Sequence, residues 1–225
     1  IKPLIDYGHN HYGENKVQEA EKKWLDIKKN NTFVKLHMVG RLQSNKAKKA
    51  VDLFDYIHSL DSEKLARELN KRELEKNKKL KYFIQVNFGS EDQKGGIEIE
   101  KLRDFCNFCK DQTQLSIVGL MAIPPNDKNP DKYFKKIAEL NKKLNLEELS
   151  IGMSNDYKNA LIQFDKRWGK VVTWKVIKRI GQRYTGVQYL AALDLKVNAD
   201  NTIGLQSEDR RIYVKIFFQD FPPSV

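Results

Sequence analysis

The feature that most constrains this chain is a repeated alternation of short apolar runs and longer amphipathic runs between residues 12 and 163. Such alternation is typical of β-α units built around a parallel sheet. Most of the short runs are apolar along nearly their whole length, as strands buried on both faces tend to be. The sequence therefore predicts six strands, at residues 12–14, 36–40, 56–60, 82–87, 117–123 and 149–153.

Amphipathic stripes predict the helices that pack on this sheet. Asp61 and Ser62 can cap the helix that carries Leu65. Six consecutive β-α units fit a closed barrel that lacks some of its strands, or an open doubly wound sheet, and we favour the barrel. The apolar stripes are Val17, Ala20, Trp24 and Ile27; Leu102, Phe105, Cys106 and Cys109; and Tyr133, Ile137, Leu140 and Leu144.

The pattern changes after about residue 164. Residues 185–196 and 210–218 resemble β-hairpin strands, and the Asn-Ala-Asp-Asn stretch at 198–201 resembles a turn. We therefore expect two units, a partial barrel at 1–163 and an unassigned β-rich tail at 164–225.

Composition narrows the function classes. The formal net charge is +11, but the lysines are spread over all the helical stretches, which favours solvated helix faces over a nucleic-acid site. No apolar run is long enough for a membrane span. The chain starts at Ile1 without a secretion signal, which indicates a truncated start, and its two cysteines fit a reducing compartment. We expect a cytoplasmic protein.

The stretch at 149–156 carries the strongest chemical signal, because a buried strand ends there and a helix begins. Gly152 allows a phosphate to approach the backbone, the hydroxyls of Ser150 and Ser154 are donors, and a helix N-terminus attracts anions. The alternative is that Ser154 or Asp156 only caps the following helix. Both interpretations remain open from these residues alone.

Other polar clusters follow the earlier strands. Asn15 can contribute to a site at the strand ends. Alternatively, it can cap the next helix, with Gln18 three residues later as the second residue of a capping box. His37 and His58 lie within apolar strands and are expected to be core or hydrogen-bonded residues, so we predict no metal. Cys106 and Cys109 form a CxxC pattern on an apolar stripe, which favours packing over redox chemistry.

Taken in order, these motifs resemble the successive strand ends of the pyridoxal-phosphate homeostasis (YggS/PROSC) family. The resemblance covers about residues 1–163. The motifs are Tyr-Gly-Glu-Asn-Lys-Val-Gln-Glu at 12–19, the stretch at 37–46, Ile-His-Ser-Leu-Asp at 57–61, Gln-Val-Asn at 85–87, Gly-Leu-Met-Ala-Ile-Pro-Pro at 119–125 and the stretch at 149–156.

The resemblance implies the barrel of the alanine racemase N-terminal domain, with pyridoxal 5'-phosphate at the carboxyl ends of the strands. It implies that the serine-rich loop from Ser150 to Ser154 and nearby backbone amides hold the phosphate, and that Asn15 lies near the ring. The cofactor-binding residues expected on this basis are Asn15, Ser59, Met121, Ser150, Gly152, Met153, Ser154 and Arg179.

Two departures from the family pattern concern the ends of the chain. The family's cofactor lysine belongs to a Val-Ser-Lys strand upstream of the segment matching Ile1, and Lys2 would lie beyond that strand, so we expect covalent attachment to be lost. The family's closing Arg-(Ile/Val)-Gly is not found at its usual place, where Gly169 follows Arg167-Trp168, but an Arg179-Ile180-Gly181 occurs ten residues late. That triplet is either a displaced end strand or a chance match, and we favour chance or a shifted coding stretch.

The function expected from the resemblance is non-catalytic binding, buffering or delivery of pyridoxal 5'-phosphate by a monomer, with cofactor-dependent enzymes as partners. A racemase-like enzyme fragment is one alternative, but such enzymes need a second acid or base from a further domain. A basic nucleic-acid-binding protein is another. A third is an inert fragment, because an open barrel exposes strand edges.

Overall fold

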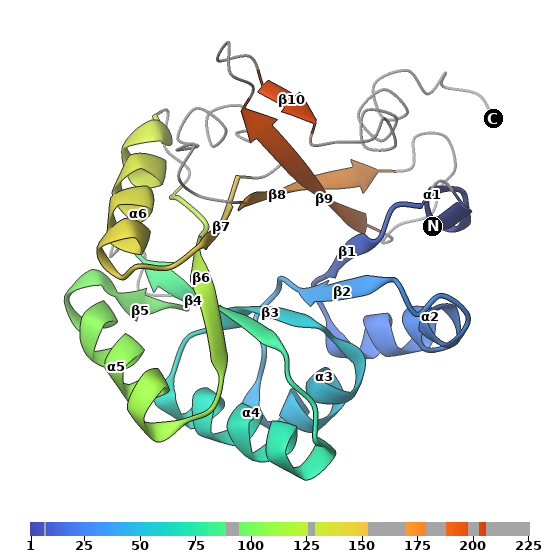
Figure 1. Cartoon of the computed structure of the whole chain (residues 1–225), viewed down its shortest axis with the longest axis horizontal. Helices are drawn as coiled ribbons and strands as arrows, with labels where there is room; N and C mark the ends of the chain where they lie inside the picture. Colours follow the sequence, from blue (N-terminus) through green and yellow to red (C-terminus); the bar gives the residue numbers. More distant parts are fainter. Residues whose placement is uncertain are drawn as a thin grey trace.

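The predicted strands lie side by side in the order in which they follow one another along the chain (Figure 1). A computed structural model of the chain describes residues 1–6, 8–88, 95–125, 129–152, 170–178, 188–197 and 203–205. Neighbouring strands in this series pair in parallel, and all six predictions are confirmed to within a few residues. The strands are β1 (His11–Glu14), β2 (Lys35–Met38), β3 (Tyr56–Leu60), β4 (Lys81–Asn87), β6 (Ser116–Ala122) and β7 (Glu148–Ile151).

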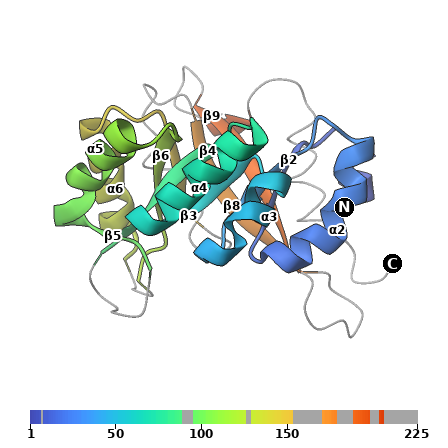
Figure 2. The ribbon, with the colours of Figure 1, turned by 90° about the horizontal axis from the view of Figure 1, so that it is seen from below.

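Helices connect these strands and cover the outside of the sheet (Figures 1 and 2). The Ser62 hydroxyl accepts a hydrogen bond from Leu65 N, so the predicted cap of α4 is confirmed. None of the helices among the described residues combines the length and apolarity needed to cross a membrane. The helices are α1 (Lys2–Asp6), α2 (Val17–Asn30), α3 (Ala47–Leu53), α4 (Glu63–Lys76), α5 (Leu102–Gln112) and α6 (Asp131–Lys143), with a short strand β5 (Ile97–Glu98) and two 3-10 turns, Ser44–Lys46 and Ile99–Lys101.

Two further strands close the sheet into a ring, and a third extends it. β8 (Lys170–Lys178) pairs in parallel with β7, and β9 (Gln188–Val197) pairs antiparallel with both β8 and β1. β10 (Ile203–Leu205), which was not predicted, pairs antiparallel with β9. The turn expected at 198–201 lies between these two strands but outside the described residues. The parallel strands therefore have no exposed edge at β1 or β7, because β9 pairs with β1 and β8 pairs with β7, which argues against the alternative of an open, inert fragment.

The β8 strand was not predicted, although its run of Val171, Val172 and Thr173 has the β-branched composition that strands favour. Residues 210–218 and the expected boundary at residue 163 lie outside the described residues. The division of the chain into two units therefore stays a prediction.

The two faces of the sheet differ in what they pack against. Tyr12 lies with its ring centroid 4.7 Å from that of Trp24 on α2, so this residue of β1 faces the helices. Because side chains alternate along a strand, His11 and Gly13 face the inside of the ring. On β3 and β4, Tyr56 and Phe83 belong to a separate small cluster inside the ring. The main apolar core lies between the sheet and the helices.

The two cysteines belong to this outer core. Cys109 is fully buried and Cys106 is partly buried against the same cluster, both on α5. Burial raises the pKa of the Cys106 thiol to about 11 and that of Cys109 to about 12. Both thiols are therefore neutral near pH 7, and their predicted packing role is confirmed.

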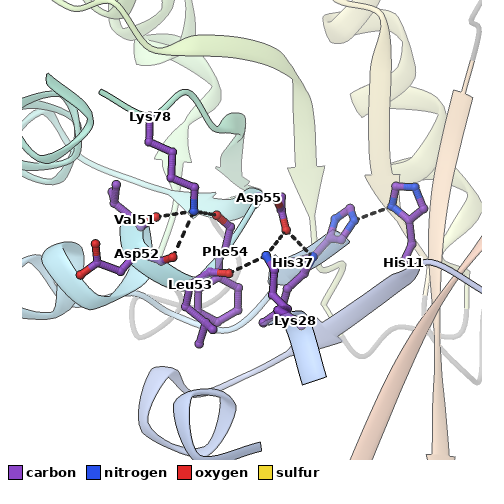
Figure 3. A network of polar contacts seen from close by, with 10 residues as sticks. His11, Lys28, His37, Val51, Asp52, Leu53, Phe54, Asp55 and Lys78 are labelled. Atoms are coloured by element: carbon purple, nitrogen blue, oxygen red, sulfur yellow. Dashed lines mark hydrogen bonds and ion pairs between the residues drawn. The ribbon is translucent and has the colours of Figure 1, made fainter. Parts of the chain in front are cut away.

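Two lysines bind the carbonyl groups at the end of α3 (Figure 3). Lys28 Nζ lies 2.8 Å from the Leu53 oxygen and 2.5 Å from Asp55 Oδ2. These contacts supply the donors that a helix C-terminus lacks and place positive charge at the negative end of its dipole. Lys78 Nζ donates to three carbonyl oxygens, those of Val51 at 2.7 Å, Asp52 at 3.2 Å and Phe54 at 3.0 Å.

Candidate functional site

The carboxyl ends of the parallel strands meet at one edge of the ring. Asn15 follows β1, Asp61 follows β3 and Gly152 follows β7. In barrels of this architecture, the loops after the strands form the functional site. Because the strands are parallel, the predicted polar residues that follow them lie at the same edge of the ring.

Strand β7 supplies Ser150 and Gly152. Ser150 is buried, and its Oγ lies 2.7 Å from His58 Nδ1 on β3. Gly152 has φ +84°, in the left-handed region where a side chain would be strained, so this turn after β7 favours glycine. Met153, Ser154 and Asp156 lie outside the described residues, and whether Ser154 binds an anion or caps a helix stays a prediction.

A chain of histidines crosses the inside of the ring from β1 to β7. His11 Nδ1 lies 2.8 Å from His37 Nε2, and His37 Nδ1 lies 2.8 Å from His58 Nε2. His58 then contacts Ser150. His37 and His58 are fully buried, so their prediction as core, hydrogen-bonded histidines is confirmed.

Aromatic rings hold these imidazoles in position. The His37 ring stacks on Tyr56 at a centroid distance of 4.1 Å and an interplanar angle of 7°. The His58 ring stacks on Phe83 at 4.2 Å and 17°. The stacks restrict tilting of both imidazole planes, so the hydrogen bonds lie along fixed directions.

Ser59 and Met121 are both buried but differ in their contacts. The Ser59 hydroxyl is fully buried and has no hydrogen-bond partner in the part of the chain that the structure describes, which is uncommon for a buried polar group. Met121 packs with Tyr56 and Phe83 inside the ring, and it is the register partner of Ser150 on the neighbouring strand. Ser59 therefore lies on β3, the strand that carries His58. Met121 lies on β6, beside the strand that carries Ser150.

Asn15 is exposed at the end of β1. The alternative that Asn15 caps the next helix is wrong, because α2 starts at Val17 and its N-cap residue is Lys16, without a side-chain cap bond. A side-chain carbon at Gly40 would collide with the Asn15 carbonyl group. Glycine at position 40 thus allows the ends of β1 and β2 to approach each other closely.

A polar cavity of about 730 Å³ lies beside these strand ends. Burial raises the pKa of Asp61 at its wall above the ordinary value, although Ser62 and Arg41 favour the charged form. Gln85 Nε2 donates to the Gly95 oxygen at 2.8 Å. The cavity is lined by Arg41, Leu42, Gln43, Ser44, Asn45, Asp61, Ser62, Lys64, Leu65 and Glu68.

Among the described residues, some of the predicted cofactor-binding residues lie close together. Met121, Ser150 and Gly152 lie on adjoining strands, Ser59 follows the histidine that contacts Ser150, and Asn15 is set apart at the surface. Arg179 lies outside the described residues. The hydrogen bonds between the histidines were not predicted from the sequence. Alternation along a strand indicates that His11 and His58 face inward, because their neighbours Tyr12 and Ile57 face the helices.

Comparison with known proteins identifies the family. The model of the alanine racemase N-terminal domain matches residues 1–169. The pyridoxal phosphate homeostasis protein of Aquifex aeolicus (strain VF5) is 38% identical over 170 residues, which cover 72% of this chain and 74% of that protein. The chain belongs to the pyridoxal-phosphate homeostasis (YggS/PROSC) family.

Two further members of this family extend the comparison. The pyridoxal phosphate homeostasis protein of Pasteurella multocida (strain Pm70) is 33% identical over 164 residues, covering 68% of this chain and 70% of that protein. The solved structure of PipY from Synechococcus elongatus PCC7942 with pyridoxal phosphate bound matches with a TM-score of 0.67 and 32% identity, over 72% of this chain and 79% of that one. The fold is therefore the incomplete barrel of the alanine racemase N-terminal kind.

Proposed function

We propose that this chain binds pyridoxal 5'-phosphate reversibly at the carboxyl ends of its barrel strands and buffers or delivers the cofactor without catalysing a reaction on it. Family membership supports the ligand, because the relatives are named for pyridoxal phosphate homeostasis and PipY was solved with the cofactor bound. When bound, the cofactor supplies a phosphomonoester and an aldehyde-bearing pyridine ring. The proposal rests on how the residues present here fit the phosphate.

The observation that carries the proposal is the arrangement after β7. Ser150 offers a buried hydroxyl, and Gly152 adopts a left-handed turn that lets an oxyanion approach the backbone. Ser59, the residue after the histidine that contacts Ser150, has a buried hydroxyl with no partner among the residues described. A bound phosphoester would supply the acceptor that this hydroxyl lacks.

The remaining expected residues would complete the site. Met121 provides an apolar surface inside the ring, and Asn15 would approach the pyridine ring from β1. Met153 and Ser154 continue the turn from Gly152 in the sequence, and Arg179 would face the ring nitrogen if Arg179-Ile180-Gly181 replaces the family's closing motif.

Non-covalent binding is the form we expect for this chain. Lys2 lies on α1, its side chain is 84% exposed, and its Nζ pairs with Asp6 at 2.8 Å. Its ammonium group is therefore held at the surface rather than inside the ring. We further infer that the protein acts as a monomer and that enzymes requiring the cofactor are its recipients.

The test is a titration of the purified chain with pyridoxal 5'-phosphate, followed by absorbance and by intrinsic fluorescence. We expect saturable binding, and binding of pyridoxal at least tenfold weaker, because a hydrogen bond to a charged group contributes about 1.5–3 kcal/mol. Reductive trapping followed by peptide mapping should find no lysine labelled in preference to the exposed lysines.

A matched pair of serine variants locates the site. Ser150→Ala should weaken binding about tenfold or more, whereas Ser116→Ala, at an exposed serine where β6 begins, should bind as the unaltered chain does. Absence of saturable binding by the unaltered chain would refute the proposed function. Equal affinities for pyridoxal and its phosphate would refute the phosphate site.

A further inference from the structure

We propose that His11, His37 and His58 form a directional hydrogen-bond chain that positions the Ser150 hydroxyl to donate to the bound phosphate. This inference rests on the proposed function and adds positioning residues to it. Three consecutive contacts of 2.8, 2.8 and 2.7 Å carry it, and they connect β1, β2, β3 and β7 across the ring.

The number of hydrogens restricts how this chain can be arranged. A neutral imidazole carries one N–H, so one ring nitrogen donates and the other accepts. His37 and His58 each use both ring nitrogens within the chain. A neutral chain can therefore satisfy all its contacts in only two ways, with hydrogens on every Nδ1 or with hydrogens on every Nε2.

The two arrangements differ at Ser150. When every Nδ1 carries the hydrogen, His58 donates to Ser150 Oγ, and the hydroxyl hydrogen is directed to another acceptor. When every Nε2 carries it, Ser150 donates its only hydrogen to His58. A phosphate oxygen accepts hydrogen bonds and donates none at neutral or higher pH, so binding through Ser150 requires the first arrangement.

Burial and aromatic stacking stabilise the hydrogen-bonded series of histidines. His37 and His58 are fully buried, and each is stacked on an aromatic ring. A broken link would separate two buried groups that are now hydrogen-bonded to each other, which is costly in a low-dielectric interior. The phosphate at one end of the chain is therefore linked to the tautomer of His11 at the other end.

The first experiment reads the tautomers directly by 15N NMR of the imidazole nitrogens in the unaltered chain. At about pH 8.5, histidines with an ordinary pKa of about 6.5 are neutral. With saturating pyridoxal 5'-phosphate, we expect the hydrogen on Nδ1 of His11, His37 and His58. Hydrogen on Nε2 of His58 in the bound state would overturn the inference while leaving the proposed function intact.

A matched pair of substitutions at His58 provides the second experiment. The amide of asparagine reaches about as far as Nδ1, and that of glutamine about as far as Nε2. We expect His58→Asn, which keeps a donor toward Ser150, to bind the cofactor within about threefold of the unaltered chain. His58→Gln, which lacks that donor, should bind about tenfold more weakly.

Urea unfolding of both variants separates a binding effect from a loss of structure. Equal affinities of folded His58→Asn and His58→Gln proteins would contradict the inference. If one variant does not fold, the NMR measurement on the unaltered chain still decides. Failure of the unaltered chain to bind the cofactor would overturn both the proposed function and this inference.

Discussion

The helix-facing and inward-facing sides of the sheet carry different kinds of residues. Toward the helices, the side chains form one continuous apolar cluster that includes Tyr12, Trp24 and Ile57. Toward the inside of the ring lie the histidine chain, Ser150 and a small cluster around Phe83. The difference indicates that the outer layer provides most of the stability, whereas the inner layer holds polar groups in the positions that ligand binding requires.

The largest expected effect tests the outer layer at Trp24. This residue is buried, and its Nε1 donates to Glu14 Oε1 at 2.7 Å. Trp24→Ala should lower the free energy of unfolding by about 3–5 kcal/mol, because it leaves a cavity and removes one of the two donors to the buried Glu14 carboxylate, the other being Lys23 Nζ at 2.6 Å. The measurement is urea unfolding, with cofactor affinity determined on the folded protein.

Leu25→Ala is the control for this prediction. Leu25 is the next residue on α2 and is 47% exposed, so its truncation should cost less than about 1 kcal/mol. Comparable losses of unfolding free energy in the two variants would contradict the stabilising role of the outer layer. Loss of cofactor binding by a stably folded Trp24→Ala protein would show that the outer layer also affects ligand binding.

A smaller effect is expected at the end of α3. Lys78→Met keeps most of the aliphatic stem but removes the ammonium group that binds three carbonyl oxygens. We expect a loss of about 1–2 kcal/mol in the free energy of unfolding, because those carbonyls lose their donor and the helix dipole loses a compensating charge. Lys71→Met, at an exposed position in the middle of α4, should change it by less than about 0.5 kcal/mol.

The outer layer should also weaken at alkaline pH. Burial raises the pKa of Cys109 from 9.0 to about 12, so the unfolded chain releases this proton at a lower pH than the folded chain does. The stabilisation is fully present below about pH 9 and is lost as the pH rises toward 12, with about 1 kcal/mol lost between pH 9 and 10. Cys109→Ala should therefore show a shallower decline in unfolding free energy over that interval, and an unchanged slope would contradict the assignment.

The smallest stability effect is expected at Ser59 of β3. Its hydroxyl is buried and has no hydrogen-bond partner among the described residues, so Ser59→Ala removes an unsatisfied polar group. The free energy of unfolding should stay the same or rise by up to about 1 kcal/mol. Affinity for pyridoxal 5'-phosphate should nevertheless fall severalfold in a titration. A clear loss of stability would mean that the hydroxyl has a structural role, and unchanged affinity would remove Ser59 from the proposed site.

Local patterns in the sequence were sufficient for the six parallel strands from β1 to β7 and for the helices α2, α4, α5 and α6, but not for the short strand β5 or for α3. Each β-α unit is encoded by its own apolar run, its amphipathic stripe and, in α4, a serine cap. The family could also be inferred, because its strand-end motifs are contiguous short stretches. Both kinds of information depend on residues close together in the chain.

Only the tertiary structure decided how the sheet closes and what the histidines contact. β9 pairs with β1, which lies far away in the sequence, and no local pattern specifies that partner. Likewise, the Ser150 hydroxyl meets His58 across 92 positions of sequence. The sequence by itself determined which residues alternate inward and outward, whereas the curvature of the closed ring determined which inward residues meet, because contact across a barrel depends on strand order and register.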